Sequence, residues 1–165
     1  MAFTVTSNSF KDGDYLPKDH ILSQDFGFGC AGGNVSPHLA WSGAPAGTKS
    51  FAVTCYDPDA PTGSGFWHWV VVNIPPTVSE LPPGAGNPAS GKLPKGALMT
   101  RTDFGQAAYG GPCPPEGDHP HRYLFTVFAV GDTLDVTPDT AAAVVGFNLH
   151  FKTLAKAAIM GLYKR

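Results

Sequence analysis

Three segments of the chain show the alternation or the short apolar runs that predict β-strands. Residues 50–56 alternate with a two-residue period, which puts Val53 and Cys55 on one face. Residues 66–74 and 122–130 are rich in β-branched and aromatic residues and apolar on both faces, as in the central strands of a sheet. Weaker strands are expected at three other places: residues 3–5, 39–41 and 134–136.

The period changes beyond Pro138, where apolar residues recur at spacings of three and four while two lysines fall on another face. This pattern predicts an amphipathic helix that ends near Gly161. Its apolar positions are Val144, Phe147, Phe151, Leu154 and Ala158. Residues 75–102 are rich in Gly, Pro and Ala without a clear period, which indicates a surface loop. The chain is therefore expected to be mainly β with a C-terminal helical segment.

Composition bounds the class of protein. The 165 residues suit one domain, residues 1–165, and the 20 glycines and 16 prolines between the apolar runs suit many turns. The 11 basic and 13 acidic residues are scattered and give a net charge of only −2, so no basic stripe is available to bind a nucleic-acid backbone. Nucleic acid is not an expected partner.

Localisation is predicted from the amino terminus, the apolar runs and the cysteines. Residues 1–8 lack the cationic and apolar regions of a secretory signal, and no apolar run reaches the ~18 residues of a membrane span. Three cysteines, Cys30, Cys55 and Cys113, cannot all pair, which argues against a disulfide framework and for a reducing compartment. A cytoplasmic protein is expected, with Cys55 as a buried structural thiol.

Polar side chains with useful chemistry gather where the predicted strands begin and end. The strands at 50–56 and 66–74 are joined by about ten residues, too few for a helical crossover, so they are expected to be antiparallel with a shared rim. Asp57 and Asp59 leave the first strand at that rim, and His68 lies near the start of the second. His121 and Tyr123, two residues apart at the start of the third strand, point from one face. These five side chains are predicted to form one cluster.

The segment Gly110-Gly111-Pro112-Cys113-Pro114-Pro115 is predicted to bring backbone close to a ligand, because glycine removes the side-chain obstacle and proline restricts the path. Its unpaired amides could bind an anion. Two nearby carboxylates repel an anion unless histidine is protonated or a carboxylate loses its charge. Anion binding at the cluster is therefore expected to depend on pH.

Structural roles compete with these functional ones. Either Asp57 or Asp59 could simply end a strand by accepting turn hydrogen bonds from the backbone. Trp67 and Trp69 are expected to share the face opposite His68 and to lie in the core or at an interface.

An ordered set of motifs resembles the phosphatidylethanolamine-binding protein family, which includes the Raf kinase inhibitor proteins, and most closely its compact bacterial branch. The motifs are Phe28-Gly29-Cys30, Asn34-Val35-Ser36-Pro37, Leu39-Ala40-Trp41, Asp57-Pro58-Asp59-Ala60-Pro61, Trp67-His68-Trp69, Tyr109-Gly110-Gly111-Pro112, His121-Arg122-Tyr123 and Gly161-Leu162-Tyr163. The resemblance implies two antiparallel sheets, a C-terminal helical segment and a small pocket for phosphate-like groups. Residues 116–120 are an insertion before the third strand.

The resemblance also implies which residues bind the ligand. By motif matching they are Asp57, Asp59, His68, Gly111, His121 and Tyr123. No catalytic residue, metal or cofactor is expected, and a homodimer is expected because many compact relatives are dimers. Relatives from eukaryotes regulate kinases by binding them.

The main hypothesis is therefore a non-catalytic binding protein whose pocket accepts a phosphoryl or other anionic group: phosphate, phosphoethanolamine or a phospholipid head group. One alternative is a docking protein or inhibitor that uses the same pocket to bind a protein kinase or protease. Another is a metal-dependent enzyme, because two aspartates and two histidines are acceptable ligands for zinc, manganese or iron. A further alternative makes Cys113 a nucleophile beside His119 or His121.

Overall fold

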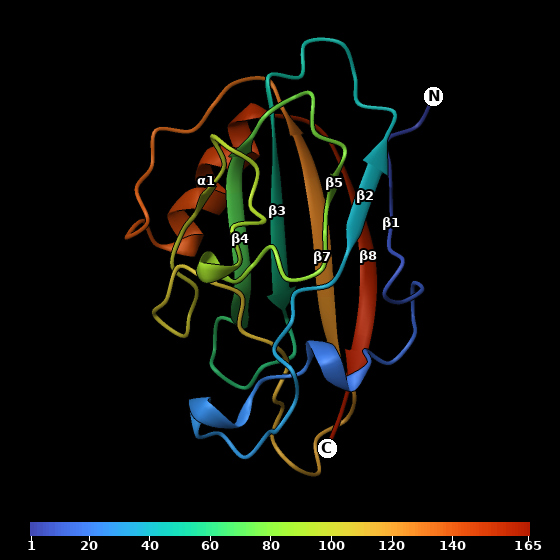
Figure 1. Cartoon of the computed structure of the whole chain (residues 1–165), viewed down its shortest axis with the longest axis vertical. Helices are drawn as coiled ribbons and strands as arrows, with labels where there is room; N and C mark the ends of the chain where they lie inside the picture. Colours follow the sequence, from blue (N-terminus) through green and yellow to red (C-terminus); the bar gives the residue numbers. More distant parts are fainter.

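The computed structural model describes residues 1–165 and contains two antiparallel β-sheets and one α-helix (Figure 1). The smaller sheet has the strand order β1-β2-β5, and the larger has the order β6-β4-β3-β7-β8. The elements are β1 (Thr4–Thr6), β2 (Leu39–Ser42), β3 (Ser50–Asp57), β4 (Phe66–Ile74), β5 (Glu80–Leu81), β6 (Leu98–Met99), β7 (His121–Val130), α1 (Ala142–Lys152) and β8 (Thr153–Tyr163), with short 3-10 turns at Lys18–His20, Gln24–Phe26 and Pro88–Ser90. The predicted fold class, mainly β with two antiparallel sheets and a C-terminal helix, is confirmed.

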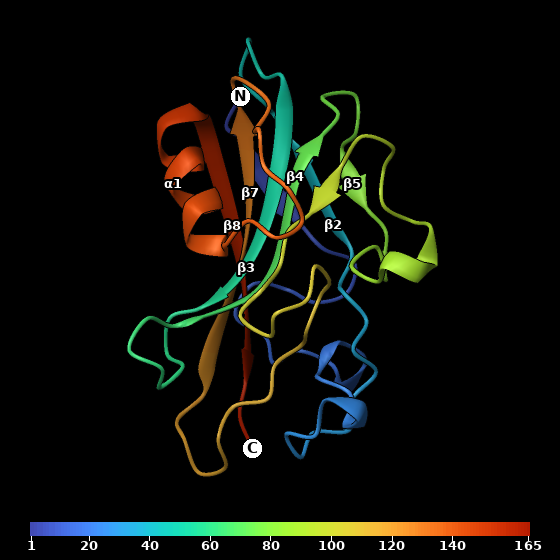
Figure 2. The same ribbon diagram turned by 90° about the vertical axis from the view of Figure 1, so that its left-hand side faces the viewer.

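Helix α1 covers one face of the five-stranded sheet, while β2 and β5 lie on the opposite side (Figure 2). Each layer encloses its own core. The larger core lies between the two sheets, and the smaller one lies under α1. The sheet is thus buried on both faces, which explains why the segments that became β4 and β7 are apolar on both faces.

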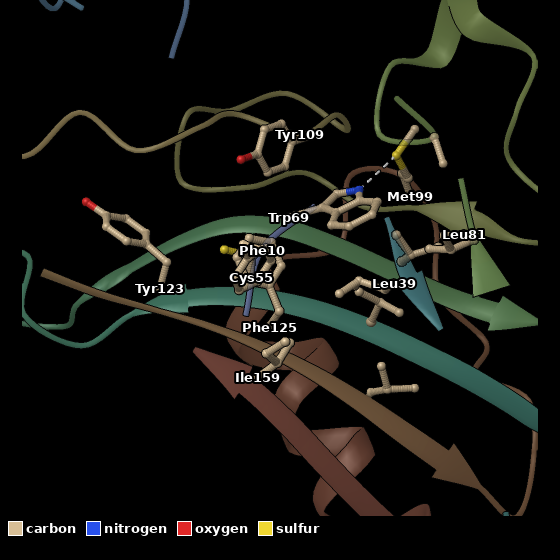
Figure 3. Packing of buried hydrophobic residues seen from close by; sticks show 14 of the residues in the cluster. Phe10, Leu39, Cys55, Trp69, Leu81, Met99, Tyr109, Tyr123, Phe125 and Ile159 are labelled. Carbon is tan, nitrogen blue, oxygen red and sulfur yellow. Dashed lines mark hydrogen bonds between the residues drawn. The ribbon is translucent and has the colours of Figure 1, made fainter. Parts of the chain in front are cut away.

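The inner face of β3 lies in the larger core, as its alternation predicted, with Val53 and Cys55 both 0% exposed. Figure 3 shows Cys55 among the buried side chains and the indole N–H of Trp69 donating to the sulfur of Met99, 3.4 Å away. Burial raises the pKa of the Cys55 thiol well above its usual value. Cys55 is therefore an inert, uncharged core residue.

A register shift in β4 changes which way its side chains point. Cys55 is opposite Trp69 and Tyr56 is opposite Trp67, so His68 has no partner on β3. Trp69 consequently lies in the larger core, while Trp67 packs against the smaller core under α1. The prediction that the two tryptophans share a face is wrong because one extra residue in a strand shifts the alternation.

The predicted C-terminal helix is correct only in its first half. The chain leaves α1 at Lys152 and continues as β8, which pairs with β7 from Thr153 opposite Val130 to Tyr163 opposite His121. Exposure alternates along much of β8, as in a strand. The spacing of four between the apolar positions Leu154 and Ala158 misled the prediction, because a separation of four satisfies both the helical period and the strand period.

The apolar stripe predicted on the helix faces solvent. Val144, Phe147 and Phe151 are 50%, 66% and 70% exposed. The residues that α1 buries are Ala142, Val145 and Leu149. The helix therefore carries two apolar stripes, and the one with smaller side chains packs on the sheet. With 11 residues in α1, no helix of this protein has the length and hydrophobicity needed to cross a bilayer.

Two short strands lie in residues 75–102, which were predicted to be a loop. β5 pairs Leu81 with Leu39, and β6 pairs Met99 with Val71. Two-residue strands are too short to show a period in the sequence. The strand predicted at residues 134–136 is absent, because the Asn73 side chain instead binds the backbone N–H and C=O of Leu134 at 2.7 and 2.9 Å.

Cys30 and Cys113 form a disulfide, although they are 83 residues apart in the sequence. The prediction that the three cysteines argue against a disulfide is therefore wrong. An odd number prevents complete pairing but permits one bond, and only the fold decides which pair meets. Disulfides persist chiefly in oxidising compartments. The cysteines therefore no longer support the prediction of a cytoplasmic location.

Candidate functional site

A small pocket opens where β3 ends and β7 begins. These strand ends lie at the lower end of the larger sheet in Figure 1. Its volume is about 160 Å³. Antiparallel pairing brings the end of β3 beside the starts of both β4 and β7, as the sequence predicted. Four of the six predicted residues line the pocket: Asp57, His68, His121 and Tyr123.

Asp57 is the buried anchor of the pocket, and its side chain is 3% exposed. Its Oδ1 accepts a hydrogen bond from the Asp59 backbone N–H at 2.8 Å. Its Oδ2 lies 2.7 Å from His121 Nδ1. Asp57 therefore has both roles considered from the sequence, because it closes the turn after β3 and also lines the pocket.

His121 lies between two carboxylates, and its side chain is 1% exposed. Nδ1 faces Asp57 at 2.7 Å, and Nε2 faces Asp118 Oδ2 at 3.0 Å. Burial disfavours the charged ring, but the hydrogen bonds to Asp57 and Asp118 outweigh it and raise the pKa of His121. Because carboxylates only accept, two such bonds require both nitrogens to donate, and the ring is an imidazolium.

His68 is held in one tautomer. Its Nδ1 donates to the Gly110 carbonyl at 2.7 Å, since a carbonyl oxygen can only accept. Burial lowers the pKa of His68, so the ring is neutral near pH 7. Nε2 then carries a lone pair, has no hydrogen-bond partner and is not among the enclosed polar atoms.

Tyr123 stands beside His68, with the two rings edge to face and their centroids 5.3 Å apart. Its hydroxyl lies near the Asp57 carboxylate, which is its side-chain hydrogen-bond partner. It is not among the enclosed polar atoms without a partner. Burial, reinforced by the charge of Asp57, raises the pKa of Tyr123 well above its usual value. The phenol therefore remains a hydrogen-bond donor at any physiological pH.

Asp59 lies outside the pocket lining. Its carboxylate receives the backbone N–H of Arg122 at 2.9 Å and two guanidinium bonds at 3.0 and 2.9 Å. The hydrogen bond from the Arg122 side chain lowers the pKa of Asp59 to about 2. Asp59 thus links the turn after β3 to Arg122 at the start of β7, and its own N–H holds the Asp57 carboxylate in place.

Gly111 also lies behind the wall. Its N–H donates to Asn34 Oδ1 at 2.8 Å, and a Cβ at this position would lie 2.3 Å from the His20 carbonyl oxygen. The Gly110 N–H donates to the His68 carbonyl at 3.0 Å. Of the three N–H groups in the segment predicted to offer unpaired amides, those of Gly110 and Gly111 are therefore paired, whereas that of Cys113, which lines the pocket, has no partner within the chain.

The sequence interpretation missed an aromatic wall around the pocket. Phe28, Phe66 and Phe104 line it, and Phe28 is 59% exposed. Phe104 packs edge to face on Phe66, with ring centroids 4.7 Å apart. Its ring also packs against Gly110, where an added Cβ would lie 2.4 Å from the Phe104 ring. Gly110 is thus required by this packing. The sequence did offer one signal for this wall. Phe66 and His68 are two residues apart on one strand, and their ring centroids are 5.0 Å apart.

The same three phenylalanines form one side of a larger groove of about 820 Å³. Polar side chains line the rest of it, including Asn34, Asp103 and Gln106. Phe104 therefore separates a small polar pocket from a wide open groove. A ligand whose head group enters the pocket has aromatic and polar surface available for the part that remains outside.

Two alternative chemistries find no support here. Cys113 is bonded to Cys30, so its sulfur is not a thiolate nucleophile. No group of three or more His, Cys, Asp or Glu side chains is arranged to hold a metal ion. His121 could not serve as a metal ligand without giving up a carboxylate partner, because both its nitrogens are occupied.

Comparison with known sequences agrees with the motif resemblance. The family model for phosphatidylethanolamine-binding protein matches residues 6–164. The UPF0098 protein YbcL of Escherichia coli is 54% identical over 164 residues, which cover 99% of this chain and 88% of YbcL. The UPF0098 protein YbhB of the same organism is 53% identical over 160 residues, 96% of this chain and 98% of YbhB. A putative lipoprotein of Mycobacterium tuberculosis, LppC, is 32% identical over 98% of this chain and 72% of its own length.

Solved structures show the same fold. The crystal structure of Escherichia coli YbcL, described as a new member of the mammalian PEBP family, matches with a TM-score of 0.96 and 53% identity over 100% of this chain and 99% of that chain. The putative phosphatidylethanolamine-binding protein homolog CT736 from Chlamydia trachomatis matches with a TM-score of 0.81 and 28% identity over 99% and 98%. A family model that spans nearly the whole chain, with relatives more than half identical to it, shows that this protein belongs to the phosphatidylethanolamine-binding protein family.

Proposed function

We propose that this protein is a non-catalytic binding protein whose small pocket accepts the phosphoryl group of phosphate, phosphoethanolamine or a phospholipid head group. The observation that carries the proposal is the unpaired Nε2 of His68 at the pocket, beside the Tyr123 hydroxyl and the cationic His121. His68 is buried as a residue, but its Nε2 faces the pocket without a partner in the chain. A phosphoryl oxygen is proposed to supply the missing hydrogen bond.

The chemistry of these groups suits a phosphoryl oxygen. Tyr123 donates its O–H, and the neutral His68 accepts a hydrogen bond from a P–OH group or, once protonated, donates N–H to a P–O⁻ oxygen. Phosphate near neutral pH carries both kinds of oxygen, with a second pKa of about 6 in its esters. The imidazolium of His121 lines the pocket and partly offsets the charge of its two carboxylate partners, which lowers the repulsion that an anion meets.

Pocket size limits what enters. The volume of about 160 Å³ is well below the ~300 Å³ at which sites for drug-sized ligands begin. Only a head group fits, and its substituent lies across Phe28 and Phe104 toward the groove. The aromatic wall is thus proposed to select the molecule that carries the phosphoryl group.

The absence of an activated nucleophile supports binding rather than catalysis. The pocket lining includes Thr62, Cys113 and Tyr123. The Thr62 hydroxyl donates to the Gly65 carbonyl, Cys113 is in a disulfide, and the pKa of Tyr123 is raised. Burial and the charge of Asp57 keep the Tyr123 phenol protonated, so none of the three is an activated nucleophile of the kind that nucleophilic catalysis requires.

Titration calorimetry with inorganic phosphate and with O-phosphoethanolamine tests the proposal between pH 5 and 8. Affinity should rise as pH falls, because His68 gains a proton and becomes a second cationic donor to the anion. His68→Ala and Tyr123→Phe should each weaken binding about tenfold, the value of one lost hydrogen bond to a charged group. His150→Ala, on the exposed surface of α1, is the matched control and should bind as the native protein does.

A comparison of free phosphoethanolamine with vesicles that contain phosphatidylethanolamine separates a soluble ligand from a lipid head group. Negligible heats for every ligand at every pH, with native and His68→Ala proteins alike, would remove the proposal. So would equal affinities for the native protein and both pocket variants.

A further inference from the structure

One polar group that touches the pocket residue His121, although it is not itself part of the pocket lining, has a role that the family motifs do not assign. Asp118 lies in the insertion at residues 116–120, and its Oδ2 is 3.0 Å from His121 Nε2. Since Asp57 occupies Nδ1 at 2.7 Å, neither nitrogen of His121 remains for a ligand. An anion can reach the cationic imidazole only at the position that Asp118 now holds.

We infer that Asp118 is a specificity-determining residue of this pocket: its carboxylate acts as an internal competitor that an anionic ligand must displace from His121 Nε2. The inference rests on the proposed function and concerns which anions succeed. A carboxylate on the same chain competes at a high effective concentration. A simple anion that offers one contact is excluded, whereas a phosphoryl group that also reaches His68 and Tyr123 gains enough contacts to replace it.

The two carboxylates that hold His121 differ in mobility. The Asp57 side chain is 3% exposed, and its second oxygen is fixed by the Asp59 N–H. The Asp118 side chain is 38% exposed, and its one hydrogen bond is the bond to His121. Asp118 can therefore turn to solvent while Asp57 stays in place.

The loop that carries Asp118 is anchored before that residue. The disulfide holds Cys113, and the Arg165 side chain donates to the Pro114 carbonyl at 2.7 Å. The Gly117 N–H donates to the Arg165 carbonyl at 3.2 Å and the Asp118 N–H to the Pro115 carbonyl at 3.3 Å. Displacement is thus confined to the Asp118 side chain, and the wall formed by Cys113 and Pro114 keeps its shape.

The charges around His121 favour an anion that replaces Asp118 over one that is simply added. The ring faces Asp57 and Asp118 through hydrogen bonds, the His119 ring at 5.5 Å and the Tyr123 ring at 6.5 Å. The nearby Arg122 is neutralised by Asp59. One imidazolium with two carboxylates leaves a net charge of −1, which repels any anion that is added. Replacing Asp118 with the ligand removes one of those negative charges as the new one arrives.

The experiment measures inorganic phosphate and acetate binding to native protein, Asp118→Ala and Asp118→Asn at pH 7. Both variants should bind phosphate about tenfold more tightly, the gain expected if Asp118 leaves the site open in about one molecule in ten. Acetate should bind to Asp118→Ala, because it restores the missing carboxylate, and should not bind to the native protein. Glu116→Gln is the matched control, since it removes a charge from the same loop at a carboxylate that is 81% exposed and 3.7 Å from Arg165.

Nuclear magnetic resonance of the histidine rings supplies a second readout. Loss of Asp118 should lower the pKa of His121, because one of its two carboxylate partners is gone, and added phosphate should raise it again. A purely structural role for Asp118 predicts no such restoration.

The outcomes separate the two proposals. Phosphate affinity that is equal or weaker in the folded Asp118 variants, with His121 unaffected by phosphate, overturns this inference and leaves the binding function intact. No phosphate binding to any of the proteins overturns both. Equal gains in Glu116→Gln and Asp118→Ala would mean that general loop charge, and not displacement at His121, controls affinity, and would also overturn it.

Discussion

His121 is kept charged in a buried position by two carboxylates of unequal burial. A buried charge is costly unless it is paired and hydrogen-bonded, and here each ring nitrogen has its own acceptor. Asp57 is held in position for this bond because its other oxygen accepts the Asp59 backbone N–H in the turn after β3. The neutral His68, which donates to a carbonyl, completes a pocket in which two histidines carry different charges because their partners differ.

Asp57→Ala should therefore destabilise the protein by about 3 kcal/mol, the cost of leaving a buried ionic partner unpaired. Urea unfolding followed by fluorescence measures this change. Asp132→Ala is the control: Asp132 likewise accepts a turn N–H, from Thr133, and pairs with Lys152, but it lies on the surface, so the midpoint should hardly move. An equal loss in both variants would contradict the importance of burial.

The pH dependence of stability should follow the raised pKa of His121. The folded state binds the proton more tightly than the unfolded state, so this contribution is complete below the unfolded value of about 6.5. It should be lost as pH rises from there through the folded-state pKa. Unfolding curves between pH 5.5 and 9 should show this decline in the native protein and a smaller one in Asp57→Ala. A flat profile for the native protein would count against a charged His121.

The C-terminal segment shows how sheet pairing overrides local pattern. β7 is bonded to β3 on one side and would present an open edge on the other, and β8 pairs with that edge along its whole length. An open edge leaves a row of backbone groups unpaired, so its closure favours the strand. Gly161 fits this arrangement because it pairs with Tyr123 and leaves room for Leu16.

Gly161→Ala distinguishes the strand from the predicted helix end. A Cβ there would lie 2.5 Å from Leu16 Cδ2, and such overpacking should cost about 1–3 kcal/mol. Gly146→Ala within α1 is the control, because nothing lies within 4 Å of its added Cβ. It should stabilise the helix by up to about 1 kcal/mol. Thermal unfolding compares the two, and a stabilised Gly161→Ala would argue against the strand.

The molecule as a whole is closed at the pocket end by links between distant parts of the chain. The Cys30–Cys113 disulfide joins the early loop to the segment before β7. Asn34 holds the same segment, since its side chain accepts from the Gly111 N–H at 2.8 Å and donates to the Tyr109 carbonyl at 3.2 Å. These links fix the wall of the pocket from outside the sheets.

Removal of the disulfide should lower stability by about 2–4 kcal/mol, because the unfolded chain regains the freedom of a loop that spans 83 residues. Calorimetric melting of native protein with and without a reductant measures the effect, and a Cys30→Ser/Cys113→Ser double variant should melt at the lower temperature under both conditions. Peptide mapping without reduction checks the bond itself. A melting temperature that is insensitive to reductant would refute this stabilising role.

Local pattern in the sequence was sufficient for the three long strands, for their antiparallel pairing at a common rim, and for the gathering of Asp57, His68, His121 and Tyr123 there. Those features depend on residue spacing and short connections, which the chain itself carries. Tertiary structure alone decided the bulge at His68, the conversion of residues 153–163 from an expected helix to β8, the pairing of Cys30 with Cys113, and the capture of the Gly111 amide by Asn34. Each depends on a partner far away in sequence, so no local period records it. The same reason hid Asp118, whose effect on His121 exists only because the folded insertion brings its carboxylate against that ring.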